Sequence, residues 1–393
     1  MPAISTAFDV PATSIQWIVL TYVVSFALTL IPAGRLADRA GHGRVFRAGV
    51  VLSGIAHLLC GLAPSWRALL GARVAQGLGA ALVMGSAPAL VTLSTDADRR
   101  GRALGRLGLA MSAGAVVGPL GGGFLVHGLG WRWVYLGRLP LVLLALGLSR
   151  KISGARGRAA SAAPAPEGPA RLGDDPAPTG LADPRTFAAA NGAHLLANAA
   201  LFAIWLLVPY YLIDRRGFPA GAGGLLFAAA PLAQACAMPL GGRAVDRGLG
   251  RGLAVLGLVV ESLGLWQTGR LDATTGTGAI LLALGLAGFG SGLFIVANMH
   301  YVMNALPRPR QGVAGSLVSL MRTAGIVLGS IVTTAVYASR QSAHAGLGAE
   351  AATAAAFIAA FEVAAAVALV AVVLSLLPPR RPAPGSVART SAP

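Results

Sequence analysis

The sequence has little charge, few acidic residues and almost no cysteine. Charged residues make up 11% of its 393 residues, with only 14 Asp and Glu in total and two cysteines, Cys60 and Cys236. Soluble domains carry about 25% charged residues, so this scarcity excludes an ordinary soluble enzyme and a highly charged disordered chain. The two cysteines lie far apart inside apolar runs, which excludes a disulfide-stapled secreted scaffold.

Long apolar runs are what the sequence has in abundance. Hydrophobic residues make up 55% of the chain, and the mean hydropathy is +0.70. Uncharged runs of about 20 residues predict membrane-spanning helices. We identify eleven runs, at 15–34, 45–63, 67–93, 102–126, 133–149, 187–213, 220–241, 252–268, 277–304, 312–337 and 352–377. The chain is therefore predicted to be an all-α polytopic membrane protein.

A segment of different composition divides these runs into five and six. Residues 150–185 are rich in Pro, Ala, Gly and charge, and they cannot bury enough apolar surface to fold. We expect a short N-terminal segment outside the cytoplasm, a bundle of about five helices, a flexible cytoplasmic linker, a bundle of about six helices and a cytoplasmic tail, at 1–14, 15–149, 150–185, 186–378 and 379–393.

The formal net charge of +17 follows the loops between the apolar runs. Of the 31 Lys and Arg, 22 fall in one set of alternate loops together with the linker and the tail, 6 in the other set and 3 inside apolar runs. Basic residues concentrate on the cytoplasmic side of membrane proteins. We therefore expect the linker and the C-terminus in the cytoplasm of a cell-membrane protein, and no nucleic-acid partner.

One short motif occurs twice. The stretch Gly34–Arg39, followed by Arg44, recurs 208 residues later as Gly242–Arg247, followed by Arg251. Each copy ends an apolar run, and we expect it to begin a short loop. Parallel repeats in a polytopic chain predict two similar helical bundles with a pathway between them.

These motifs resemble the signatures of major facilitator superfamily transporters. The repeated stretch is similar to the signature between the second and third family helices, although His42 and Gly43 stand where basic residues are usual. The resemblance assigns to a gating loop Gly34, Asp38, Arg39, Gly41, Arg44, Asp246 and Arg247. Asp38 would accept hydrogen bonds from a neighbouring helix N-terminus or an Arg and hold the cytoplasmic side closed. The alternative is an ordinary charged loop.

Two further stretches carry the resemblance. Arg73 and Gln76 match the signature of the fourth family helix. The antiporter signature of the fifth helix, which belongs to drug:proton antiporters, matches Gly105, Gly114, Gly118, Pro119, Gly122 and Gly123. We expect these glycines to let two helices pack backbone to backbone, and Pro119 to bend the helix. Packing alone is the alternative to a role in antiport.

The chain departs from the family at its beginning. Its first residues resemble the end of the first family helix, so we expect eleven helices where the family has twelve. The first helix of this branch often carries an acidic residue used in coupling. The start is either misassigned or that of a truncated member, and this keeps open a non-transporting membrane protein on the same fold.

Polar and charged residues inside apolar runs are candidates for ion coupling, because a charge at membrane depth costs roughly 2.5–3.5 kcal/mol and needs a functional or structural reason. The candidates are Arg73, Gln76, Glu261, Glu362, Arg322 and His194. For Arg73 the alternative is a structural Arg bonded to backbone carbonyls, and for His194 it is a packed neutral side chain.

Polar stripes at helical spacing indicate which faces line a substrate cavity. The stripes contain Tyr22, Ser25, Thr29, Asn191, His194, Asn198, Asn298, Ser319 and Thr323. Ser and Thr can instead satisfy neighbouring helices, so packing remains the alternative for each stripe.

The sequence shows no metal-binding constellation, no nucleophile triad and no phosphate loop, so we expect no cofactor and no enzyme activity. Uphill transport would then draw on an ion gradient. The sequence predicts a monomeric exporter of small hydrophobic or amphipathic compounds, acting by proton antiport in the manner of multidrug efflux. A dedicated exporter of one metabolite is the main alternative.

Overall fold

The computed structural model describes residues 4, 7–10, 16–149, 184–306 and 310–377. In this part of the chain the secondary structure is helical, with no strand. The predicted linker at 150–185, apart from its last two residues, and the predicted tail at 379–393 lie outside the described residues.

The described helices form two groups. The first group contains α2 (Gln16–Ala40), α3 (His42–Gly61), α4 (Trp66–Leu93), the short η2 (Ala97–Arg99), α5 (Arg100–Leu129), α6 (Trp133–Leu136) and a helix at 139–149. The second group contains α8 (Pro184–Tyr210), η3 (Tyr211–Arg215), α9 (Ala220–Phe227), α10 (Ala229–Asp246), α11 (Gly250–Gly269), α12 (Thr277–Ala305), α13 (Gln311–Ala343), η5 (Ala345–Leu347) and α14 (Ala349–Ser375).

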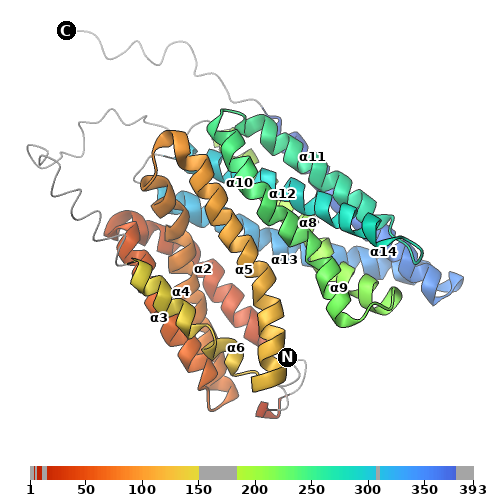
Figure 1. Ribbon diagram of the computed structural model, residues 1–393, viewed down its shortest axis with the longest axis horizontal. Helices are drawn as coiled ribbons and strands as arrows, with labels where there is room; N and C mark the ends of the chain where they lie inside the picture. Colours follow the sequence, from red (N-terminus) through yellow and green to blue (C-terminus); the bar gives the residue numbers. More distant parts are fainter. Residues whose placement is uncertain (1–3, 5–6, 11–15, 150–183, 307–309, 378–393) are drawn as a thin grey trace, which may run out of the picture.

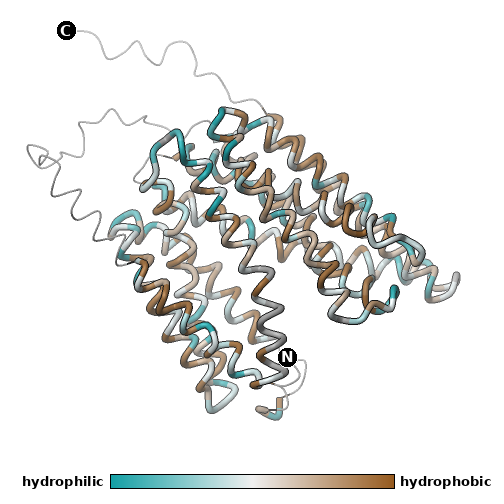
Figure 2. The backbone as a smooth tube through the Cα atoms, in the orientation of Figure 1, coloured by the Kyte–Doolittle hydropathy of each residue, from teal (hydrophilic) through white to brown (hydrophobic). Residues whose placement is uncertain are grey.

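These helices suit a membrane. Among the described residues, nine helices are long and apolar enough to cross one. The two other predicted spans correspond to α5, a helix of 30 residues, and to the shorter apolar segment Trp133–Ser149. Large apolar side chains such as Leu28 and Leu225 are more than 70% exposed, which is expected of a surface that contacts lipid. Hydrophilic residues gather toward the helix ends (Figure 2).

The two groups are bundles that meet at one end (Figure 1). There α2 packs on α13, and α5 packs on α10. Toward the end that carries α6 and α9 the bundles diverge (Figure 1). Within each bundle the helices pack closely, and the largest apolar core lies among α8, α12 and α14 around Phe361.

The repeated motif is helical, which differs from the expected loop. Residues 34–40 form the last turns of α2, and residues 242–246 form the last turn of α10. Ala, Leu and Arg are good helix formers, so the helix continues past the apolar run. It ends at Gly41, whose φ of +94° is a conformation that favours glycine. The helix end thus places each motif carboxylate at the junction of the bundles.

Candidate functional site

Asp38 joins the two bundles. It lies near the end of α2, and its carboxylate oxygens accept hydrogen bonds from the backbone amides of Gly312 (2.7 Å) and Val313 (3.2 Å) at the start of α13. The first amides of a helix have no partner inside that helix and carry the positive end of its dipole. A carboxylate is therefore a suitable cap, and here it comes from the other bundle.

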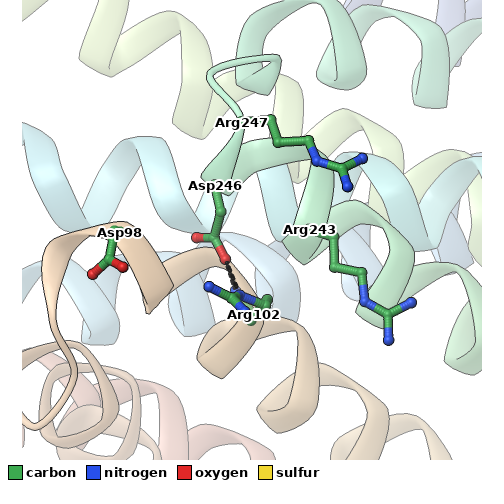
Figure 3. A pocket seen from close by; sticks show the side chains of 5 residues that line it. All are labelled: Asp98, Arg102, Arg243, Asp246 and Arg247. Carbon is green, nitrogen blue, oxygen red and sulfur yellow. Dashed lines mark hydrogen bonds and ion pairs between the residues drawn. The ribbon is translucent and has the colours of Figure 1, made fainter.

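Asp246 makes the equivalent contact at the other seam. It ends α10 and accepts from the amides of Gly101 (2.7 Å) and Arg102 (3.1 Å) at the start of α5. The Arg102 side chain donates a further bond from Nε at 2.9 Å (Figure 3). The two motif copies therefore cap one another's bundle at the same end of the molecule.

Glycines permit both contacts. A Cβ on Gly312 would meet the backbone oxygen of Gly34 at 2.5 Å, and a Cβ on Gly101 would meet that of Gly242 at 2.5 Å. Real Cβ atoms do not approach so closely. Each carboxylate can therefore reach its amides only because small residues let the backbones touch.

The surroundings of the two carboxylates differ. The Asp38 carboxylate faces the His42 ring, with Nε2 at 3.5 Å, where Asp246 has the Arg102 guanidinium. Arg39 and Arg44 are exposed and form no ion pair with Asp38. Around Asp246 lies a charged pocket of about 350 Å³, lined by Asp98, Arg102, Arg243, Asp246 and Arg247 (Figure 3).

The α5–α10 seam runs inward from Asp246 and then stops. A Cβ on Gly105 would meet the Met238 backbone at 2.5 Å, and Ser112 Oγ donates to Gln234 Oε1 at 3.2 Å. Beyond that point Gly114 and Gly118 face open space, so the expected backbone packing occurs at Gly105 and is absent at these two glycines in this conformation. Helix α5 continues through Pro119, Gly122 and Gly123, whose side-chain surroundings lie outside the described residues, as does the bend expected at Pro119.

Arg73 belongs to a fully bonded network inside the first bundle. Its Nε donates to the carbonyl of Ile18 at 2.8 Å, its Nη1 donates to Gln76 Oε1, and its guanidinium lies over the Tyr22 ring. Gln76 Nε2 lies 3.0 Å from His57 Nε2, and His57 Nδ1 lies 2.5 Å from the carbonyl of Ser53. A carbonyl can only accept, so Nδ1 carries the ring proton and Nε2 accepts from Gln76. Tyr22 and Gln76 thus hold Arg73.

The candidates of the second bundle are less satisfied. His194 is 1% exposed, and neither ring nitrogen has a hydrogen-bond partner; its ring lies against Phe294. Arg322 on α13 is half-buried. Glu261 is fully buried with both oxygens unpartnered, whereas Glu362 is exposed on α14. The structure therefore separates the two mid-span carboxylates.

Several cavity candidates bond to their own helix. The hydroxyls of Ser25, Ser319 and Thr323 each donate to a carbonyl four residues earlier. Ser25 also packs against Gly77 of α4, and Thr29 is half-buried. For the three hydroxyls a carbonyl one turn back satisfies the donor without any cavity water, so their role in a cavity stays a prediction.

The amide stripe on α8 is buried. Asn191 and Asn198 donate to the carbonyls of Phe187 and His194, and all of these polar side chains are less than 9% exposed. The expectation that this stripe lines an open cavity differs from what this conformation shows. Asn298 on α12 lines a cavity of about 340 Å³ between α8, α11, α12 and α14, and its amide nitrogen has no partner.

Sequence reasoning missed three residues that the structure connects. His57 completes the Arg73 network, and Gln234 and Ser291 form a polar link between α10 and α12. Each is a polar residue inside an apolar run, and that position was the available signal, because a polar side chain at membrane depth needs a partner.

Two helical bundles joined by reciprocal carboxylate caps define a polytopic membrane protein of the two-bundle transporter class. Residues 1–187 and 190–392 match the sequence profile of the Major Facilitator Superfamily. The chain belongs to this family of membrane transporters.

Relatives of this chain include drug-resistance proteins. The chain is 29% identical over 389 residues to the multidrug resistance protein Stp of Mycobacterium tuberculosis, covering 87% of this chain and 72% of Stp. It is 40% identical over 147 residues to the puromycin resistance protein pur8 of Streptomyces alboniger, covering 37% of this chain and 29% of that protein. The fold resembles the crystal structure of the human organic anion transporter MFSD10, with a TM-score of 0.68, 14% identity, and coverage of 94% and 87% of the two chains.

Proposed function

We propose that this protein is a secondary active exporter of small hydrophobic or amphipathic compounds, which it exchanges for protons by alternating access. The observation that carries the proposal is the pair of carboxylate caps, Asp38 on α13 and Asp246 on α5, both at the end where the bundles meet. Two such caps act as a latch on one side of a pathway between the bundles.

The strength of the latch suits a reversible gate. A hydrogen bond to a charged group contributes about 1.5–3 kcal/mol. Two capped helix starts then hold the end closed by a few kcal/mol, which binding of a substrate or a proton can overcome. The excess of basic residues near this end supports a cytoplasmic position for it. In the proposed cycle, the described conformation is then the one closed to the cytoplasm.

The relatives support export of drug-like compounds. Stp is a multidrug resistance protein and pur8 confers puromycin resistance. Puromycin is accordingly the first compound to test. Proton exchange is the coupling that the antiporter signature of α5 implies.

The test is puromycin uptake into inside-out vesicles from cells that produce the protein. We expect accumulation when the vesicle interior is acidic and loss of accumulation when a protonophore collapses the pH gradient. Vesicles lacking the protein provide the background. Uptake that is independent of the pH gradient would refute proton exchange. Transport of only one compound out of a tested panel would favour the dedicated exporter.

The gate is tested separately with Asp246→Asn and the matched variant Asp98→Asn. Both change one carboxylate in the same charged pocket, but Asp98 is exposed and, among the described residues, its ion pair is with its neighbour Arg99. We expect transport to fall in Asp246→Asn and to stay near the wild-type rate in Asp98→Asn.

A further inference from the structure

A buried carboxyl inside the second bundle forms no hydrogen bond of normal geometry with the described residues, and the Ser291 hydroxyl is placed to supply one. Glu261 lies in the middle of α11 at 0% exposure, and neither Oε1 nor Oε2 has a partner. Helices α11 and α12 touch on either side of it, since a Cβ on Gly290 would meet the Glu261 Cα at 2.9 Å and a Cβ on Gly264 would meet the Ala287 Cα at 2.6 Å. The carboxyl is therefore enclosed by protein.

No charged group offsets a negative charge there. Titratable and charged groups on α11 and the helices packed against it are Arg251, His300, Tyr301, Glu350, Glu362, Arg185, His194, Tyr210, Arg243, Asp246 and Cys236. None forms an ion pair or a hydrogen bond with Glu261. An isolated buried carboxylate costs several kcal/mol, far more than the neutral acid. The described conformation therefore holds Glu261 in its protonated form.

A chain of polar side chains leads from this carboxyl to the other bundle. Ser291 on α12 lies beside Glu261. Gln234 Nε2 on α10 donates to Ser291 Oγ at 3.3 Å, and Ser112 Oγ on α5 donates to Gln234 Oε1 at 3.2 Å. Four helices are thus linked, and the last of them belongs to the first bundle.

The chain reaches the α5–α10 seam at the point where the seam ends. Outward of Ser112 the helix α5 faces open space at Gly114 and Gly118. Gln234 is half-buried, whereas Ser291 is 2% exposed and Glu261 is fully buried. Gln234 is therefore the member of the chain that water can reach.

We propose that Glu261 is a proton-binding site whose occupancy is coupled through Ser291 and Gln234 to closure of the α5–α10 seam; this deepens the proposed function and rests on it. In the closed conformation the acid keeps its proton. Deprotonation breaks the O–H bond, leaves the electron pair on the carboxylate and passes the proton to water that enters along Gln234.

The coupling follows from what the carboxylate then requires. An ionised Glu261 needs donors, and the nearby Ser291 hydroxyl must turn toward it. Ser291 is held by Gln234, and Gln234 is held by Ser112 of the other bundle. A shift of the Ser291 oxygen toward the carboxylate therefore displaces the acceptor of the Gln234 amide and, through Gln234, the acceptor of the Ser112 hydroxyl in the seam. Opening the seam admits water that stabilises the charge. Proton loss and seam opening then favour one another.

The first experiment observes the proton without any transported compound. Infrared spectra of the purified full-length protein in lipid are recorded from acidic to alkaline pH, following the carbonyl stretch of protonated carboxylic acids. We expect a band that disappears with rising pH in the wild type and is missing in Glu261→Gln. Glu350→Gln, which alters an exposed glutamate at the start of α14, should retain it. A spectrum unchanged by Glu261→Gln overturns the proposal, and so does a band that persists at every pH.

The second experiment observes the seam. Spin labels at the exposed positions Arg106 on α5 and Leu240 on α10, in a background free of Cys60 and Cys236, report the distance between the two helices. We expect this distance to lengthen over the pH range in which the carboxyl band disappears. Glu261→Gln, which mimics the neutral acid, should keep the short distance at every pH, and Glu350→Gln should behave as the wild type.

Gln234→Ala tests whether proton binding at Glu261 is coupled to the α5–α10 seam or is independent of it. We expect it to retain the titrating carboxyl band and to lose the pH-dependent distance change, because it cuts the link and leaves the acid in place. A distance change that survives in Glu261→Gln or in Gln234→Ala overturns the coupling. Failure of puromycin transport would count against the proposed function and would leave both of these measurements as they are.

Discussion

The interiors of the two bundles differ in how completely their polar side chains are hydrogen-bonded. In the first bundle the side chains of Arg73, Gln76 and His57 bond to one another and to backbone carbonyls. In the second bundle both oxygens of Glu261 and both ring nitrogens of His194 have no partner. Since most buried polar groups in proteins are hydrogen-bonded, the open groups need a reason.

The difference separates polar groups that are hydrogen-bonded in this conformation from polar groups that would gain a partner in another conformation. A network in which every member is hydrogen-bonded favours one geometry, because the loss of any member leaves its neighbours without a partner. A buried polar group without a partner is tolerated when another conformation supplies one. That partner can be water, a proton or a substrate. Under the proposed function we expect the first bundle to act as a fixed frame, and the second to hold the groups whose protonation or hydration changes during the cycle.

Cutting the closed network is expected to have the largest effect. Gln76→Leu removes the acceptor of an Arg73 donor and the donor to His57, so two buried polar groups lose a partner. We expect a loss of about 2–3 kcal/mol, seen as a clear drop in the apparent melting temperature of the purified protein. Gln76→Glu retains an acceptor for Arg73 and should lose less. A melting temperature within error of the wild type would show that the network is not cooperative.

The seam carboxylates are expected to follow. Asp246→Asn keeps an acceptor for the Gly101 amide but loses the charge that pairs with Arg102, which we expect to weaken seam closure by about 1–2 kcal/mol. The measurement is the distance between spin labels at Arg106 and Leu240, because these positions lie outside the contact between Gly101 and Gly242. Asp98→Asn is the control. Equal distances in Asp246→Asn and the wild type would remove Asp246 from the latch.

The same amide-to-leucine change in the open bundle should cost little. Asn298 is buried and its amide nitrogen has no partner. Asn298→Leu therefore removes a buried donor whose loss of water is not offset by a hydrogen bond, and it takes no acceptor from a described neighbour of that nitrogen. We expect a change within about 1 kcal/mol, in either direction. The measurement is again the apparent melting temperature, compared with that of Gln76→Leu. A drop as large as that of Gln76→Leu would mean that the two interiors do not differ.

Much of the architecture follows from the sequence, because a helix that must satisfy its own backbone in lipid needs a long apolar run. Family membership follows from the repeated motif and is confirmed by the profile match. The partner of each motif carboxylate does not follow, because Asp38 and Gly312 are 274 residues apart. A clue existed in residues 307–310, which offer no capping Ser, Thr, Asp or Asn before α13, so its first amides needed an acceptor from elsewhere.

The polar stripes show where sequence reasoning ends. Ser319 and Thr323 have the spacing of a cavity face, yet their hydroxyls bond one turn back along α13. Spacing fixes which face a residue lies on, but it does not say whether its donor is already satisfied. The isolated residues His57 and Gln234 are bonded across helices, and no periodic pattern marks them.

The smallest predicted effect concerns a surface loop of the second bundle. It tests whether polar groups without hydrogen-bond partners are confined to the interior of that bundle. Asp272 lies in the loop between α11 and α12, and its Oδ1 accepts three hydrogen bonds. The donors are the Thr274 amide at 2.7 Å and the hydroxyls of Thr274 and Thr275. These bonds, the Thr274 side chain first, lower the pKa of Asp272 to about 2. A lowered pKa means that the contribution is complete above the ordinary value near 4 and is lost as the pH falls through about 2.

We therefore expect this loop to keep its structure at every pH used for transport. Asp272→Asn should speed hydrogen exchange of the Thr274 amide severalfold at neutral pH, because the charged acceptor is gone, while the melting temperature barely changes. Exchange at Thr274 that is equal in Asp272→Asn and the wild type would show that the loop is held by other bonds. A loop that loosened in the wild type between pH 7 and pH 5 would contradict the lowered pKa, and it would extend the pH sensitivity proposed for Glu261 to the surface of the same bundle.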